Sequence, residues 1–318
     1  MKRLPRPRRS LWLVLGLVIG GLATAATMAV AGLQPADLNF TPHSEAQMTN
    51  IDVGRAWAKN YYGAHTATSG PGGTWATSLN PESNYANEAR SVASQGENWL
   101  AARSRVPHRA IVLDVDDTTL TTWNYELYSN WDFNPTTNGQ FVGLTSGTFT
   151  GNMFPATPGM VDLANRATAL GYAIFWITGR GDSQHAATIA NLVNDTAAGL
   201  PNIDTVTLNG QTIPEVDAGY VTPTPIDIGH GGFTDGLFTK PPIGSYPAYL
   251  DTPEFCGPFI HATPPASCPT IQYKSGTRAY IESQGYDIVG DFGDQFSDLE
   301  GGFANKVFKM PNPNYYLP

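Results

Sequence analysis

The sequence predicts an α/β fold in which helices flank a parallel sheet. Three short apolar runs, at residues 110–113, 172–177 and 286–290, have the length and composition of buried strands. Each run ends in polar residues, and apolar positions at helical spacing occur between the runs. Because ligands of open α/β sheets bind at the carboxyl ends of the strands, we expect these polar residues to form one functional site.

The first 31 residues have the pattern of a secretory signal peptide. Five basic residues precede an apolar run from Leu11 to about Gly32, and Ala29-Val30-Ala31 matches an A-x-A cleavage site. We predict secretion with cleavage. The alternative is an uncleaved anchor, because the apolar run is long, and only then would the chain contact a membrane.

Charge and composition limit which partners and how many domains the remaining chain can have. Cleavage after Ala31 would remove five basic residues and no acidic ones, leaving 13 basic against 27 acidic residues and a net charge of −14. Such a charge argues against a nucleic acid partner. The 318 residues suffice for one large or two small domains, and the 41% of hydrophobic residues allow a substantial core.

Residues 32–105 are predicted to form a linker and two helices that pack on the sheet. Residues 33–42 are expected to be extended, and a Gly/Ser/Thr-rich loop from Gly63 to Pro81 separates the helices, His43–Tyr62 and Asn84–Arg103. The first helix is inferred from the spacing of its apolar residues, which are Met48, Ile51, Val53, Trp57 and Tyr61. The segment is too short to favour a separate domain.

The first buried run leads into the acidic stretch Asp114-Val115-Asp116-Asp117-Thr118-Thr119. Strand alternation points Asp114 and Asp116 to the same side, where two carboxylates repel unless a cation lies between them or one is protonated. A hard divalent ion such as Mg²⁺ would serve as the cation between the carboxylates. A protonated carboxyl group would instead divide the work, with one aspartate as the nucleophile and the other as the acid/base. An EF-hand calcium loop is excluded, because its Gly and Glu positions hold Thr119 and Tyr125. An ordinary acidic turn remains the alternative.

The segment that follows is predicted to add a small cap and the second strand. Residues 121–156 are rich in aromatic residues without a clear period, which we interpret as a cap, with surface packing as the alternative. A helix is expected from Gly159 to Leu170, followed by the buried run 172–177 and the turn Thr178-Gly179-Arg180-Gly181. A helix from Asp182 to about Asn194 would place its N-terminus beside this turn, which suits a phosphate oxygen.

The last third of the chain contains an insertion and the third strand. Residues 200–270 carry little regular pattern apart from short strands at 205–208 and 237–238, and they contain the two cysteines, Cys256 and Cys268. In an exported chain these are expected to form a disulfide, with free thiols as the alternative. Lys274 then precedes a helix at about 276–283. The run 286–290 leads into a second acidic cluster at 291–298, and a last strand is expected at 305–309.

Three blocks of sequence carry a family resemblance. They are Leu113-Asp114-Val115-Asp116-Asp117-Thr118-Thr119-Leu120, then Ile177-Thr178-Gly179-Arg180, and a block from Tyr273-Lys274-Ser275 through Arg278 and Gly285-Tyr286 to Gly293-Asp294-Gln295-Phe296-Ser297-Asp298-Leu299. The chain resembles the haloacid-dehalogenase-like superfamily, and within it the secreted acid phosphatases of the plant-type and class B kinds. The resemblance implies a Rossmann-like phosphatase core over residues 106–318, with a cap at about 121–156 and an insertion at about 200–270.

The resemblance also implies roles for individual residues. Asp114 would attack the phosphorus atom and form an aspartyl-phosphate, and Asp116 would protonate the leaving group and then activate water. Thr178, Gly179 and Lys274 would bind the phosphoryl group, with Lys274 neutralising charge.

The implied metal is Mg²⁺. Its ligands would be Asp114, the backbone carbonyl of Asp116, and Asp294, with Asp298 bound directly or through water. Asp291 would lie nearby without touching the ion.

The sequence therefore predicts an exported, Mg²⁺-dependent acid phosphatase that hydrolyses small-molecule phosphate monoesters. A non-catalytic exported binding or storage protein is one alternative, because some plant relatives serve as storage proteins with the nucleophile replaced. The presence of Asp114 favours activity. A phosphotransferase that passes the phosphoryl group to an alcohol is the other alternative.

Overall fold

The structure, a computed structural model, describes residues 42–63, 68–70, 73–75, 79–103, 107–208, 210–226 and 233–317. The chain divides into two units, Met1–Thr49 and Asn50–Pro318. Within the first unit the described residues form one short 3-10 helix, η1 (Glu45–Gln47). The predicted signal peptide, and the predicted linker apart from residue 42, lie outside the described residues. No helix found in the described ranges combines the length and apolar character needed to cross a membrane.

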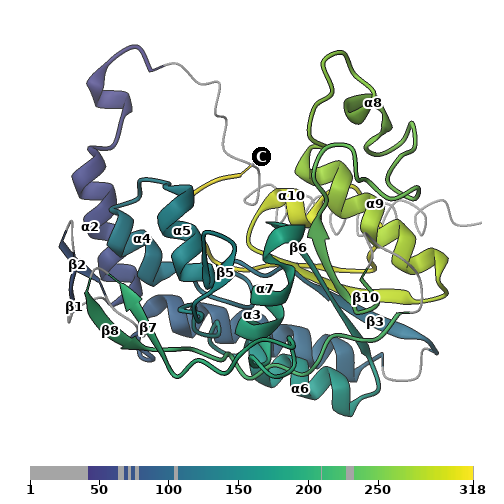
Figure 1. Ribbon diagram of the computed structural model, residues 1–318, viewed down its shortest axis with the longest axis horizontal. Coiled ribbons are helices and arrows are strands. Elements are labelled where there is room, and N and C mark those ends of the chain that lie inside the picture. Colours follow the sequence, from purple (N-terminus) through teal and green to yellow (C-terminus); the bar gives the residue numbers. More distant parts are fainter. Residues whose placement is uncertain are drawn as a thin grey trace, which may run out of the picture. The chain divides into compact units, whose positions relative to one another are not determined.

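The described residues of the second unit are built on a five-stranded parallel sheet (Figure 1). Its strands are β3 (Arg109–Leu113), β6 (Ala173–Gly181), β9 (Leu237–Lys240), β10 (Asp287–Gly293) and β11 (Val307–Lys309), in the spatial order β11-β10-β3-β6-β9. The chain adds β6 and β9 on one side of β3, then returns to add β10 and β11 on the other. Such a reversal leaves a crevice at the carboxyl end of β3, where ligands of α/β sheets bind. The predicted α/β fold is thus confirmed, with β9 and β11 joining the three predicted strands in one sheet.

Alternate residues of β3 face opposite sides of the sheet, as strand geometry requires. Ile111 and Leu113 pack in the cluster that contains residues of α3 (Asn84–Ala101) and α6 (Met160–Ala169). Ala110 and Val112 pack in a second cluster with residues of α9 (Thr270–Ser283). The sheet therefore has helices on both faces, with α9 on one side and α3 and α6 on the other (Figure 1). Both positions follow from a strand that is apolar on each of its faces.

The first predicted helix is shorter than expected and presents a different face. Helix α2 spans Ile51–Tyr62 and not His43–Tyr62, because the Asn50 side chain caps it by accepting hydrogen bonds from the N–H groups of Asp52 and Val53. The predicted apolar face is also wrong, since Ile51 and Trp57 are exposed. Burial instead falls on Ala58 and Tyr62, and the Tyr62 ring stacks on Trp123 with centroids 4.1 Å apart.

The segment from residue 121 to 156 forms two helices and a hairpin. These are α4 (Trp123–Ser129), α5 (Pro135–Val142), β4 (Leu144–Thr145) and β5 (Thr148–Phe149). Another short hairpin, β1 (Thr68–Gly70) and β2 (Gly73–Trp75), lies in the stretch predicted to be a loop. The buried rings of Trp123, Tyr125 and Phe141 join the α3/α6 side of the core, so the aromatic residues of this segment anchor it to the rest of the unit.

The segment from residue 200 to 270 contains both surface structure and part of the sheet. Strands β7 (Thr205–Leu208) and β8 (Gln211–Pro214) pair only with each other, in an antiparallel hairpin. Strand β9 pairs in parallel with β6, and a short helix, α8 (Gly257–Ile260), follows. The predicted disulfide Cys256–Cys268 is present, and both cysteines are fully buried.

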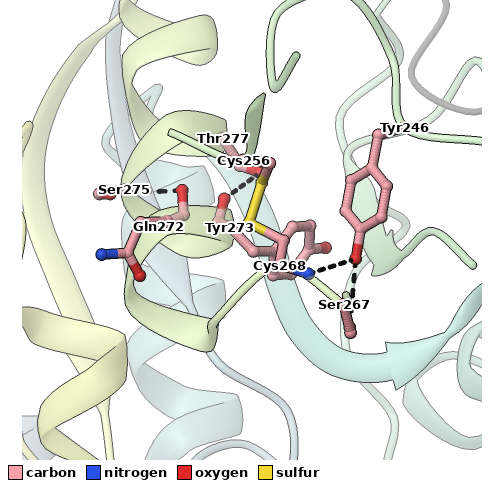
Figure 2. The surroundings of a disulfide bond; sticks show 8 residues. All are labelled: Tyr246, Cys256, Ser267, Cys268, Gln272, Tyr273, Ser275 and Thr277. Atoms are coloured by element: carbon pink, nitrogen blue, oxygen red, sulfur yellow. Dashed lines mark hydrogen bonds between the residues drawn. A yellow bond between two sulfur atoms is a disulfide. The ribbon is translucent and has the colours of Figure 1, made fainter. Parts of the chain in front are cut away.

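The disulfide closes a loop immediately before α9, and its surroundings hold that loop in place (Figure 2). The Cys268 N–H donates to the Tyr246 hydroxyl at 3.1 Å, and the same hydroxyl lies 3.3 Å from Ser267 Oγ. Helix α9 then begins at Thr270, six residues earlier than the predicted start at Gly276. Lys274 is consequently a residue of a helix and not of the loop before it.

Two other predicted elements differ at their ends. Strand β6 continues through Gly181, so the predicted turn at 178–181 is extended chain. The helix expected from Asp182 to Asn194 is a 3-10 helix, η2 (Asp182–Gln184), followed by α7 (His185–Leu192). Within the second acidic cluster, α10 (Phe296–Leu299) follows β10.

Candidate active site

The first acidic cluster lies at the carboxyl end of β3, beside the crevice in the strand order. The Asp114 N–H donates to the carbonyl of Phe292 at 2.9 Å, so sheet pairing extends as far as this carboxylate. The chain then turns back, and the Thr119 hydroxyl donates to the Asp114 carbonyl at 2.9 Å. Asp117 supplies the left-handed conformation of the turn, with φ of 55°. The turn leaves Asp114 only 6% exposed, at the wall of a cavity.

Lys274 of α9 reaches Asp114 from the other side of the crevice. Its Nζ donates to Oδ1 of Asp114 and, at 2.6 Å, to Oδ1 of Asp298. Burial raises the pKa of Asp114 well above its ordinary value, although the Lys274 ammonium group lowers it. Burial lowers the pKa of Lys274, but the two carboxylates outweigh it, so the pKa is raised and the lysine stays charged. The sequence therefore predicted correctly that these residues meet.

The second acidic cluster brings Asp294 and Asp298 to the same place. Asp294 is buried, and its oxygens accept hydrogen bonds from Thr118 Oγ1 (3.1 Å), Gln295 Nε2 (2.6 Å) and Asn312 Nδ2 (2.7 Å). Burial, followed by the charge of Asp298, raises the pKa of Asp294 to about 7. Uncharged donors hold this carboxylate in position without neutralising it.

Gly293 allows Asp298 to approach β10 closely. A Cβ atom at residue 293 would overlap the Cβ of Asp298 and lie 2.7 Å from its Oδ2. The same Oδ2 accepts the Gln295 N–H at 2.8 Å, so the side chain turns back over the strand end. The glycine within the second acidic cluster is thus a steric requirement of the site.

Three of the four predicted metal ligands form a group that fits a hard cation. One carboxylate oxygen each from Asp114, Asp294 and Asp298 lie within 4.8 Å of one another, and all three residues are buried. Lys274 is the one cation that the ion pairs of the described chain place against this group. Three buried carboxylates against one lysine leave excess negative charge, and oxygen-only donors suit Mg²⁺.

Thr178 and Gly179 lie at the end of β6 and line the same cavity. Thr178 is 1% exposed, and its hydroxyl accepts the Arg180 N–H at 3.2 Å. The expected phosphate cradle at the start of the next helix is partly occupied, since the Gly181 N–H donates to Gln184 Oε1 at 3.2 Å. The hydroxyl of Thr178 and the backbone at exposed Gly179 remain the groups here that a phosphoryl oxygen can reach.

Asp116 faces Arg180 and not the Asp114–Lys274 pair. Arg180 Nε lies 2.9 Å from one Asp116 oxygen and Nη2 lies 2.6 Å from the other, a two-pronged ion pair. Arg180 is held in turn by Thr188 Oγ1, at 3.2 Å from Nη1. The Asp116 side chain is 30% exposed, so it has room to change rotamer toward the cavity.

The cavity has a volume of about 460 Å³ and is lined by several segments between Asp114 and Leu317. Segment 121–156 contributes Thr122, Tyr125, Glu126, Trp131, Phe133 and Asn138, and the chain near its C-terminus contributes Asn314, Tyr315 and Leu317. This late stretch is tied to the site, because Gln295 Oε1 accepts the Leu317 N–H at 3.1 Å. A wall of mixed aromatic and polar side chains therefore surrounds the acidic floor of the cavity, which is formed by Asp114, Asp294 and Asp298.

Several residues at the site were missed from the sequence. Lys240, at the end of β9, lines the cavity, and burial followed by the charge of Lys274 lowers its pKa. Lys240 reaches the cavity because β9 joins the sheet. The short apolar run at 237–238 was the feature of the sequence that could have indicated this. Asp117 accepts hydrogen bonds from the N–H and hydroxyl of Thr122, which anchors the start of α4. No pattern in the sequence around Asn312 and Asn314 indicated that these residues would lie at the site.

Asp291, predicted to lie near the metal without touching it, pairs with Arg278. Asp291 Oδ2 lies 3.1 Å from Nη1 of Arg278, an ion pair that lacks hydrogen-bond geometry. The guanidinium group donates instead to three carbonyl oxygens, those of Asp298, Glu300 and, at 2.8 Å, Gly302. Arg278 thus fastens the α10 segment to α9, which carries Lys274.

Comparison with known proteins places this geometry in a family. Vegetative storage protein 2 from Arabidopsis thaliana is 48% identical over 48 residues, which are 15% of this chain and 18% of that protein. Stem 28 kDa glycoprotein from Glycine max is 28% identical over 51% of this chain and 44% of its own length. Acid phosphatase 1 from Solanum lycopersicum is 26% identical over 51% and 43%. The chain thus spans less than half of each of these relatives.

A structural likeness and a family model complete the comparison. The class C acid phosphatase from Bacillus anthracis aligns over 72% of this chain and 80% of its own, with 19% identity and a TM-score of 0.40. The family model described as HAD superfamily, subfamily IIIB (acid phosphatase) matches residues 75–215 and 263–318, which are more than half of the chain. The resemblance inferred from the three sequence blocks is therefore confirmed, and the chain belongs to the acid phosphatase family of HAD subfamily IIIB.

Proposed function

We propose that this protein is an exported, Mg²⁺-dependent acid phosphatase that hydrolyses small phosphate monoesters through an aspartyl-phosphate on Asp114. The observation that carries the proposal is the buried contact of Lys274 with Asp114 at the cavity wall, beside Asp294 and Asp298. Membership of the acid phosphatase family supports the reaction class.

In the first step a carboxylate oxygen of Asp114 attacks phosphorus and the ester P–O bond breaks. Lys274 lies against this carboxylate and is positioned to offset the charge of the phosphoryl oxygens. The Thr178 hydroxyl, at the end of the neighbouring strand, donates a hydrogen bond to one of those oxygens. The proton that the leaving oxygen needs comes from Asp116.

In the second step water attacks the phosphorus of the aspartyl-phosphate and the Asp114 O–P bond breaks. Asp116 accepts a proton from this water, so phosphate is released and both aspartates return to their starting forms. Both roles require the Asp116 carboxyl group to exchange its contact with Arg180 for one with the reacting oxygen. Catalytic contacts of this kind often form only when substrate binds.

Asp114, Asp294 and Asp298 would hold Mg²⁺, together with the backbone carbonyl of Asp116. When bound, the ion offsets the mutual repulsion of these carboxylates and the charge of the substrate. The chain contributes the fixed position of each ligand: Gln295 and Asn312 orient Asp294, and Gly293 admits Asp298.

The proposed substrate is small and anionic. A cavity of about 460 Å³ with aromatic side chains on one wall suits an organic phosphate monoester. Lys240 adds a positive charge at the wall formed by β9. Export is supported by the signal-peptide pattern at residues 1–31 and by the buried disulfide, which persists in oxidising compartments.

The test is hydrolysis of a chromogenic phosphate monoester by protein that lacks residues 1–31. Activity is measured from about pH 4 to about pH 8, a range that spans ordinary carboxylate and histidine titration, with Mg²⁺ and with chelator. Asp114→Asn should abolish turnover, and the same change at exposed Asp162 of α6 should not. Turnover that survives Asp114→Asn would remove the nucleophile from the proposal, and turnover unaffected by chelator would remove the metal.

A non-catalytic storage role is the second candidate, because the relatives include proteins named vegetative storage proteins. It predicts Mg²⁺ binding without turnover under any condition. The nucleophile position argues against it, since Asp114 is present and paired with Lys274. Adding an acceptor alcohol to the assay separates hydrolysis from transfer, which would yield a new phosphate ester.

A further inference from the structure

A second group of carboxylates lies away from the cavity, between α7 and the hairpin β7–β8. Asp195 follows α7, and Glu215 and Asp217 follow β8. One carboxylate oxygen from each lies within 4.8 Å of the others. Among the ion pairs of the described residues, none brings a lysine, arginine or histidine to these three groups. Three negative charges at this separation repel one another.

Asp195 is the residue of the group that most needs a further partner. It is 3% exposed, and its Oδ2 accepts the Ile203 N–H at 2.7 Å. Its Oδ1 is buried and has no hydrogen-bond partner within the part of the chain that the structure describes. Buried carboxylate oxygens are normally satisfied, because an unpaired one loses its hydration without compensation. A ligand with positive charge would satisfy it.

The backbone holds the group together in spite of this repulsion. The Asn152 N–H donates to Glu215 Oε1 at 2.9 Å, and the Val216 N–H donates to the Asn152 carbonyl at 3.0 Å. The Glu215 N–H donates to the Asp204 carbonyl at 3.1 Å. These bonds fix the backbone of the stretch after β8 against the loop after β5, so the three residues are held close to one another.

We propose that Asp195, Glu215 and Asp217 form a site for a hard divalent cation, most specifically Ca²⁺. Ca²⁺ takes about 6–8 oxygen ligands in a flexible geometry, so three carboxylates and several waters can together complete its coordination. Asp195 is buried, Glu215 is half-buried and Asp217 is exposed, which leaves an open side for the water ligands that complete the coordination. The ion would join the end of α7 to the β7–β8 hairpin.

A shared proton is the competing way to relieve the repulsion. Burial, followed by the charges of Asp217 and Asp195, raises the pKa of Glu215 to about 7, although its hydrogen bond from Asn152 lowers it. Protonation of Glu215 would relieve one pair of oxygens and leave Asp195 Oδ1 without a partner. The two explanations differ in whether Ca²⁺ binds, and this difference can be measured.

The experiment is calorimetric titration of the full chain with Ca²⁺ in excess Mg²⁺, which is added to fill the metal position proposed for the active site. We expect one Ca²⁺ site, a rise in the unfolding temperature on binding, and unchanged phosphatase activity. Asp195→Asn should abolish the site. Asp204→Asn is the matched control, because Asp204 is an exposed aspartate outside the group, and its Oδ1 accepts a hydrogen bond from Asn202 Nδ2 at 3.2 Å.

A further variant keeps the test informative if Asp195→Asn fails to fold. Asp217 is exposed, so Asp217→Asn should fold normally and weaken Ca²⁺ binding by about tenfold or more through the loss of one charged ligand. Absence of Ca²⁺ binding in Mg²⁺, or an unchanged site in both Asp195→Asn and Asp217→Asn, would overturn the proposal. Neither result depends on the phosphatase mechanism, because binding and not turnover is measured.

Discussion

Replacing Arg278 with methionine should weaken the fold and the active site together. The side chain is 1% exposed and contacts three carbonyl oxygens as well as the carboxylate of Asp291. Methionine retains much of the aliphatic volume but provides no donor. The substitution therefore leaves Asp291 as a buried charge without its cation, and it releases the α10 segment that carries Asp298.

The expected decrease in the free energy of unfolding follows from these contacts. Removing one partner of a buried ion pair costs about 3–5 kcal/mol, and leaving a buried acceptor unpaired costs about 1–3 kcal/mol. The two costs overlap, so we expect a loss of about 4–5 kcal/mol at about pH 8. Burial raises the pKa of Asp291 to about 6, and Arg278 lowers it, so the variant takes up a proton more readily. Below about pH 6 the charge penalty disappears and a loss of about 1–3 kcal/mol should remain.

Urea unfolding at about pH 8 and about pH 5.5 measures both quantities, on either side of the Asp291 titration. The matched control is the double variant Arg278→Met with Asp291→Asn, which has no buried charge and should show the smaller loss at both pH values. Activity of folded Arg278→Met should fall as well, because the backbone carbonyl of Asp298 loses its hydrogen bond from α9. A loss that is equal at the two pH values, or below about 1 kcal/mol, would refute the assignment of Arg278 as the partner of Asp291.

Three further predictions concern other parts of the second unit. Opening the disulfide by Cys256→Ala with Cys268→Ala should cost about 3 kcal/mol in urea unfolding, from the loop entropy of a sequence separation of 12, and unchanged stability would contradict this. Gly293→Ala should lower kcat/KM by about 100-fold, since a methyl group there displaces Asp298, and near-normal activity would show that Asp298 is not needed in its present position. The pKa of Asp294 is raised above its ordinary value to about 7, so in chelator the contribution of this residue to stability is present at about pH 4 and lost as pH rises through about 7. Thermal unfolding with and without Mg²⁺ checks this, and parallel pH profiles would contradict it.

The central sheet and the acidic floor of the site could be predicted because their signals are local. Residues 110–113 are buried on both faces of β3 and are apolar without interruption, so the strand and its polar end can be identified from adjacent residues. The same holds for β6 and β10. Once the strands are assigned to one parallel sheet, Asp114, Thr178 and Asp294 must meet at one edge.

The parts that were missed depend on contacts between distant segments. Apolar spacing in α2 predicted a buried face, but Trp57 is exposed and Tyr62 is buried, because burial is decided by the position of Trp123 and Tyr85 against the helix. Lys240 reaches the cavity only because β9 pairs with β6 across a long insertion. The contact of Asp116 with Arg180 is likewise a product of the turn geometry at two strand ends and has no signal in either strand alone.

The stretch from Asn312 to Leu317 determines when, during translation, the acidic floor of the site can be completed. Asn312 donates to Asp294, and Tyr315 and Leu317 contact Gln295 and Ser297, so the acidic floor is finished by residues that leave the ribosome after all the others in the site. A nascent chain that has already formed β3, β6, β9 and β10 of the central sheet would still lack Asn312, one of the three donors that orient Asp294. The orientation of Asp294 is therefore completed only after the other residues of the acidic floor have been translated.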